Sequence, residues 1–90
     1  MGRIKVTPDQ IRQMSTQFKQ AGEQSRQMLS TLNSSVDGMQ SEWEGMTQQR
    51  FFQEYEQRKT SMTQFAQQLE DISQQLDGVA ARFETVDTGN

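Results

Sequence analysis

The chain has 90 residues, 31% of them hydrophobic, a net charge of −3 and no cysteine or histidine, which limits it to a single small domain over residues 1–90. These absences exclude disulfides and thiol chemistry, the usual zinc and transition-metal ligand sets and a nucleophile paired with histidine. The acidic balance argues against nucleic acid as a partner, and we expect no enzymatic activity, no metal and no cofactor.

The first predicted element is a helix over residues 8–41. Its start is marked by Thr-Pro-Asp-Gln at residues 7–10, which combines a capping threonine, a proline suited to the first turn and a capping-box glutamine. From there, apolar or small residues recur in alternating steps of three and four, a coiled-coil spacing that strands do not produce. This stripe, which we expect to face the second helix, is Ile11, Met14, Phe18, Ala21, Ser25, Met28, Leu32, Ser35 and Met39.

A turn over residues 42–46 is predicted next, and it contains Trp43-Glu44-Gly45 with the only tryptophan of the chain. Gly45 would supply a backbone conformation closed to residues with a Cβ. Trp43 either packs on the ends of the helices or is exposed as an interface anchor, a favoured role of tryptophan. Both roles hold if the ring is partly packed and partly presented.

The second predicted helix covers residues 47–86 and is followed by a frayed tail at 87–90. Because the turn is short, the two helices run antiparallel, which gives an all-α helical hairpin. Arg58 is the polar intrusion in its stripe, either with a solvated guanidinium or paired with Glu23 or Asp37 of the first helix. The stripe is Phe51, Tyr55, Arg58, Met62, Phe65, Leu69, Ile72, Leu76, Val79, Phe83 and Val86.

A lone hairpin of this size has no disulfide or metal to stabilise it, so we expect oligomerisation. Small and apolar residues beside the main stripe of the first helix are the predicted dimer interface. They are Ala21, Gly22, Ser25, Leu29 and Val36, and Phe52, Ala66 and Ala80 lie at the equivalent flank of the second helix. The expected product is a four-helix bundle of two hairpins.

The central Trp-x-Gly turn, the chain length and the two flanking heptad helices together resemble the WXG-100 family, the small ESAT-type substrates of type VII secretion. The resemblance implies an antiparallel dimer, either a homodimer or a pair with a paralogous hairpin. It also implies that a membrane-bound FtsK/SpoIIIE-type ATPase recognises Trp43 and Gly45 as part of an export signal. The N-terminus lacks an apolar signal-peptide segment, so the expected route is from the cytoplasm to the outside without a cleaved signal peptide.

The resemblance extends to the end of the second helix. Phe83-Glu84-Thr85-Val86-Asp87 matches the C-terminal export motif Tyr-x-x-x-Asp/Glu of the family, with Phe83 in place of the tyrosine. Residues four apart share a helix face, so the Phe83 ring and the Asp87 carboxylate would be presented together. The alternative is that Phe83 is simply a core residue of the heptad pattern.

Two other functions fit the same helices. One is an intracellular helical adaptor or chaperone that binds partner helices, and the other is an extracellular effector that acts on membranes. The host, the choice between homodimer and heterodimer and the role after secretion are not contained in the sequence.

Overall fold

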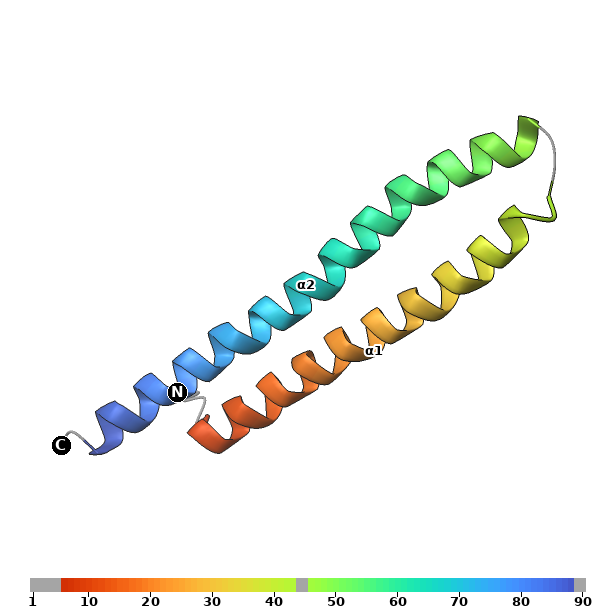
Figure 1. Ribbon diagram of the computed structural model, residues 1–90. Coiled ribbons are helices and arrows are strands. Elements are labelled where there is room, and N and C mark those ends of the chain that lie inside the picture. Colours follow the sequence, from red (N-terminus) through yellow and green to blue (C-terminus); the bar gives the residue numbers. More distant parts are fainter. Residues whose placement is uncertain (1–5, 44–45, 89–90) are drawn as a thin grey trace.

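The structure, a computed structural model, describes residues 6–43 and 46–88, with the backbone alone at 46, 47 and 85–88. Two helices, α1 (Pro8–Gln40) and α2 (Met46–Thr88), run antiparallel side by side with the turn at one end (Figure 1). The predicted all-α hairpin is confirmed, while the dimer stays a prediction. Glu44 and Gly45 of the Trp-x-Gly triplet lie outside the described residues.

The start of α1 is a capping box. The Thr7 hydroxyl accepts a hydrogen bond from the Gln10 amide at 3.1 Å, and the Gln10 side chain accepts one from the Thr7 amide at 3.0 Å, so two amides at the helix end are satisfied. At the other end of the chain, α2 continues to Thr88. Residues 87 and 88 are therefore helical, whereas the sequence predicted a helix end at about 86.

The hairpin is a rod rather than a globule. It measures 68 × 23 × 19 Å and its radius of gyration is 20.2 Å, whereas a compact domain of this length would have about 12 Å. In such a rod each helix has only one neighbour. One side of each helix can therefore be buried within the chain, and the rest must face solvent or a partner.

The buried seam between the helices consists mainly of small residues, with Ile11 and Leu29 at its two ends in α1, and it differs from the predicted stripes. In α1 and α2 the buried residues follow one another in steps of seven or four: Ile11, Ser15, Gly22 and Leu29 in α1, and Ala66, Ser73 and Ala80 in α2. Met14, Met28, Leu32 and Met39 are exposed. The predicted core stripe is therefore wrong for most of α1, because the small residues of a neighbouring stripe, Ser15 and Gly22, allow the helices to approach more closely.

Gly22 marks the closest approach of the two helices. A Cβ built there would lie 2.8 Å from Glu70 Cγ and 3.3 Å from the Ala66 carbonyl oxygen, distances that real contacts rarely show. Two turns away along the seam, the buried Ser15 hydroxyl lies 2.9 Å from the Ser73 carbonyl oxygen and 2.6 Å from Asp77 Oδ1. The seam is therefore narrow, and side-chain hydrogen bonds cross it.

This geometry predicts that Gly22→Ala destabilises the hairpin. Alanine is a better helix former than glycine by about 1 kcal/mol, but overpacking a tight contact costs about 1–3 kcal/mol, and Glu70 would have to move. The melting temperature measured by circular dichroism should fall.

Gly38→Ala is the matched control, since nothing lies within 4 Å of a Cβ at Gly38. That variant should gain stability from helix propensity alone. Equal stabilisation by both substitutions would mean that the helices do not meet this closely at Gly22.

Candidate functional site

An aromatic cluster closes the turn end of the hairpin. The Trp43 ring lies 5.6 Å from the ring of Phe51 and 6.0 Å from that of Phe52, centroid to centroid, and Phe51 stacks on Tyr55 at 6.2 Å. Such aromatic contacts contribute beyond the area they bury. Trp43 nevertheless stays 37% exposed, so the indole is packed on one side and presented to solvent on the other.

Hydrogen bonds hold Trp43 in place at the end of α1. Its backbone amide donates to the Met39 carbonyl at 3.0 Å, as does that of Glu42. Across the hairpin, the Tyr55 hydroxyl donates to Asn33 Oδ1 and the Gln48 amide group donates to the Gln40 carbonyl at 3.2 Å. When the hairpin is closed, contacts from both helices therefore define the position of the indole.

Phe83 lies in the last turns of α2 (Met46–Thr88), at the end of the hairpin opposite the turn. Its side chain is 43% exposed, so it is not the core residue that its heptad position also allowed. Asp87 lies on the same helix, with its side chain outside the described part of the chain. Trp43 and Phe83 are thus on one chain but at opposite ends, and a single hairpin does not bring the two proposed signals together.

The structure describes all five residues of the predicted dimer interface, which stays a prediction. Gly22 and Leu29 are buried within the hairpin; Gly22 lies directly against α2, whereas Leu29 also lines an open hollow between the helices. Ala21, Ser25 and Val36 are half-buried. The sequence therefore placed two seam residues, Gly22 and Leu29, on the outer face of α1, because the pattern of one helix does not show which of two adjacent stripes allows the closer contact.

One side of the hairpin is an apolar face, which sequence reasoning assigned to the core. It carries a hollow of about 220 Å³ lined by both helices through Ser25, Met28, Leu29, Leu32, Met62 and Phe65. A second hollow of about 210 Å³ beside it is lined by Gln17, Phe18, Ala21 and Leu69. Met28 is 63% exposed and Phe65 is 55% exposed, so large side chains project next to the hollows. Projecting groups beside recesses are what a packed interface uses.

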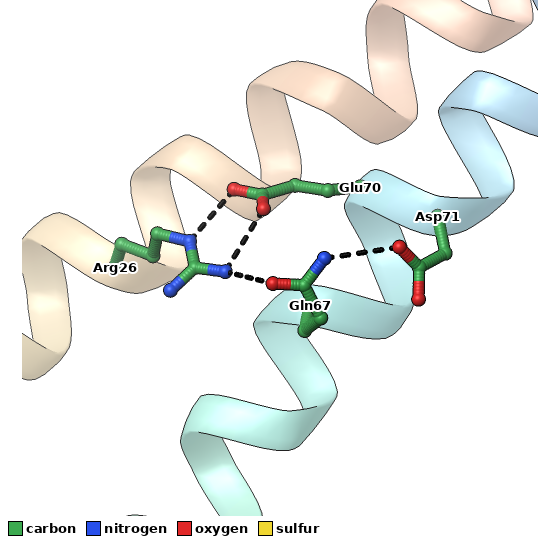
Figure 2. Close-up of polar contacts among 4 residues, drawn as sticks. All are labelled: Arg26, Gln67, Glu70 and Asp71. Carbon is green, nitrogen blue, oxygen red and sulfur yellow. Dashed lines mark hydrogen bonds and ion pairs between the residues drawn. The ribbon is translucent and has the colours of Figure 1, made fainter.

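The other side of the hairpin is a polar face that clamps the helices together. Figure 2 shows Arg26 of α1 reaching Glu70 with two hydrogen bonds, of 2.7 and 2.9 Å, and Gln67 with a third of 2.8 Å. Gln67 in turn donates to Asp71 at 3.0 Å. A two-point arginine–carboxylate contact fixes geometry as well as adding attraction, so this clamp sets which residues of the helices lie side by side.

The clamp changes the acidity of Glu70. Hydrogen bonds from Arg26 lower the pKa of the Glu70 carboxyl below its usual value, partial burial opposes this, and the positive charge of Arg26 adds to the lowering. The Glu70 side chain is 25% exposed. Arg58, by contrast, is exposed, and among the described residues it makes no ion pair with Glu23 or Asp37.

Two features are absent from the described part of the chain. No group of three acidic side chains is arranged to hold a metal ion. Neither helix, over its described length, is apolar enough to cross a membrane.

Comparison with known proteins agrees with this architecture. The family described as proteins of 100 residues with WXG matches residues 3–88. The chain is 34% identical to Protein YukE of Bacillus subtilis, covering 96% of this chain and 89% of that protein. It is 38% identical to the type VII secretion system extracellular protein A of Staphylococcus aureus, covering 89% of this chain and 82% of that protein.

Solved structures agree as well. The secreted protein EsxB of Bacillus anthracis superposes with a TM-score of 0.84 at 31% identity, covering 97% of this chain and 99% of that one. EsxA of Geobacillus thermodenitrificans gives a TM-score of 0.85 at 25% identity, covering 97% and 95%.

The fold and the sites define a small helical-hairpin protein with a tryptophan at its turn and a free apolar face. The chain belongs to the WXG100 family, and the resemblance seen in the sequence is confirmed.

The clamp predicts a pH dependence of stability. Because the pKa of Glu70 is lowered in the folded state, the clamp contributes fully above the unfolded pKa of about 4.3 and is lost as pH falls through the folded pKa. Glu70→Gln should therefore lose stability at pH 7 and little at pH 2, as measured by urea unfolding at both pH values.

Glu54→Gln serves as the control, since Glu54 is an exposed carboxylate of the same helix. It should leave the difference in stability between the two pH values near that of the unchanged chain. A Glu70→Gln variant with the unchanged pH dependence would show that the clamp does not stabilise the hairpin.

Proposed function

We propose that this protein is a non-enzymatic substrate of type VII secretion and that it is exported as a folded antiparallel dimer. The observation that carries the proposal is the exposed apolar face, which a soluble monomer rarely retains. The names of its relatives support the secretion route. The proposed occupant of the face is a second copy of the chain.

The spacing of the apolar face supports a self-pairing arrangement. The apolar stripe of each helix has the same spacing when read in either direction along the chain. The centre of this symmetry lies between residues 26 and 27 in α1 and at Gln67 in α2. Reversal exchanges Met14 with Met39, Ala21 with Leu32 and Ser25 with Met28 in α1, and Phe51 with Phe83, Met62 with Ile72 and Phe65 with Leu69 in α2.

The two centres lie side by side, because Arg26 donates a hydrogen bond to Gln67. One two-fold axis can therefore cross both helices and lay the apolar face of one hairpin on that of an antiparallel copy. This is the self-complementary contact that a symmetric dimer needs. The result is a four-helix bundle with the Arg26–Glu70 clamp on its outer, polar surface.

The same symmetry gives the export signal its geometry. In the antiparallel pair, the turn of one hairpin lies next to the C-terminal end of the other. Trp43 and Gly45 of one chain would then form a composite surface with Phe83 and Asp87 of its partner. We propose that the FtsK/SpoIIIE-type ATPase of the secretion apparatus recognises this surface, so that only a correctly paired dimer is exported.

Dimerisation predicts a clear effect of charge on the apolar face. Phe65→Asp would place one carboxylate from each chain next to the two-fold axis, and burying them unpaired should weaken the dimer by at least about a hundredfold. Sedimentation equilibrium at micromolar concentration measures this directly, and the variant should remain helical because Phe65 is exposed in the single hairpin.

Thr63→Asp introduces the same charge on the polar face, where Thr63 lines a hollow with Arg26, Ser30 and Asp37, and it should leave dimerisation unchanged. A folded wild-type chain that stays monomeric would contradict the homodimer. A paralogous hairpin would then be the expected partner of the apolar face. Equal dimerisation of the Phe65→Asp and Thr63→Asp variants would show that the dimer interface does not lie on the apolar face.

If Trp43 and Asp87 belong to the export signal, replacing either residue should reduce export without unfolding the protein. Trp43→Ala and Asp87→Ala each remove a group of the proposed signal, and the stability change for Asp87→Ala should stay within about 0.5 kcal/mol. Both variants should dimerise but accumulate in the cell, as measured by the ratio of extracellular to cellular protein. Phe83→Tyr restores the hydroxyl of the family motif and should preserve or raise export.

A signal composed of residues from both chains predicts a specific result for mixed dimers. When the Trp43→Ala and Asp87→Ala chains are co-expressed, a mixed dimer has one doubly altered composite site and one intact site. If one intact site is enough, the mixed dimer should be exported although neither variant is exported alone. Normal export of folded Asp87→Ala would remove this residue from the signal.

A further inference from the structure

Burial within the hairpin is confined to one half of its length. We define the base half as residues 8–29 with 66–84, and the tip half as residues 30–43 with 48–65. Every buried residue of the described chain lies in the base half, from Ile11 to Leu29 in α1 and from Ala66 to Ala80 in α2. Within the described tip half, the best-covered side chains are only half-buried.

The cause is the size of the side chains that meet in the seam. In the base half these are Gly22, Ser15, Ala66 and other small residues, so the helices approach closely. In the tip half the residues that continue the same seam are Asn33, Val36, Phe52, Tyr55 and Lys59, all half-buried. Large or polar groups at these positions leave part of their surface exposed, so this half of the seam buries less apolar surface.

Polar cross-links follow the same division. The base half holds Ser15 against Ser73 and Asp77, Arg26 against Glu70 and an Arg12–Glu84 ion pair. The tip half is crossed by Tyr55 with Asn33 and by Gln48 with Gln40, and its end is closed by aromatic rings that stay largely exposed. A region with little buried surface opens at lower free energy than the rest of a protein.

The antiparallel dimer supplies what the tip half lacks. In that arrangement, which rests on the function proposed above, each tip half lies over the base half of the partner. Leu32 would pack near the partner's Ala21, and Met39 near the partner's Met14. We propose that the base half folds as a stable unit within one chain, while the tip half closes fully only when the second copy covers it.

This device would make the position of Trp43 conditional on pairing. In a single chain the tip half opens often, and the indole has no fixed relation to the rest of the hairpin. In the dimer the tip half closes, and Trp43 is fixed beside the partner's C-terminal end. A partner that recognises a fixed Trp43 would then distinguish the paired from the unpaired chain before reading any other residue.

Amide hydrogen exchange of the full chain, followed by mass spectrometry, tests this. The wild-type chain is measured above and below its dimerisation midpoint, and Phe65→Asp provides a monomer at high concentration. In the monomer, amides of the tip half should exchange at least about tenfold faster than those of the base half. Dimerisation should slow the tip half strongly and the base half little.

Two variants assign the effect to the contacts named. Tyr55→Phe removes the bond to Asn33 and should speed exchange in the tip half alone, whereas Ser15→Ala should speed it in the base half. Equal exchange in the two halves of the monomer, or equal slowing of both on dimerisation, would overturn the inference. A chain that remains monomeric at every concentration would instead overturn the proposed dimer.

Discussion

The close approach of the helices at Gly22 is the constraint on which the rest of the molecule depends. Without a Cβ at this position, α1 can lie against the Ala66 carbonyl and the Glu70 side chain. Ser15, Ser73 and Ala80 continue this narrow seam toward the end of the hairpin opposite the turn. Because this seam is built of small residues, the large apolar side chains are left outside it, on one face of the hairpin.

The two faces of the hairpin then have different tasks. The polar face carries the Arg26–Glu70 clamp, which aligns the helices through directional contacts (Figure 2). The apolar face carries methionine, leucine and phenylalanine around shallow hollows. A rod of this shape has little interior, so most of its apolar surface can be removed from water only by association. Stability and partner choice are thus linked through the same side chains.

The separation of Trp43 and Phe83 has a consequence for recognition. A hairpin places its turn and its C-terminus at opposite ends of a rod 68 Å long, and only antiparallel pairing brings the two ends of different chains together. A partner that recognises both ends at once would therefore bind the dimer and not the single chain. The family membership and the extracellular relatives make export the process in which such a test would operate.

The sequence alone determined the helical hairpin, its capping box at Thr7, its turn near Trp43 and its family, because these depend on local residue patterns. It did not determine which stripe of each helix faces the other. Both stripes have heptad spacing, and the choice between them depends on the distance between backbones, which Gly22 and Ala66 allow to shorten. Only the tertiary structure decided that Leu29 is internal and that Met28 and Phe65 are exposed, because a gain from close packing of small residues cannot be read from the hydrophobicity of one helix.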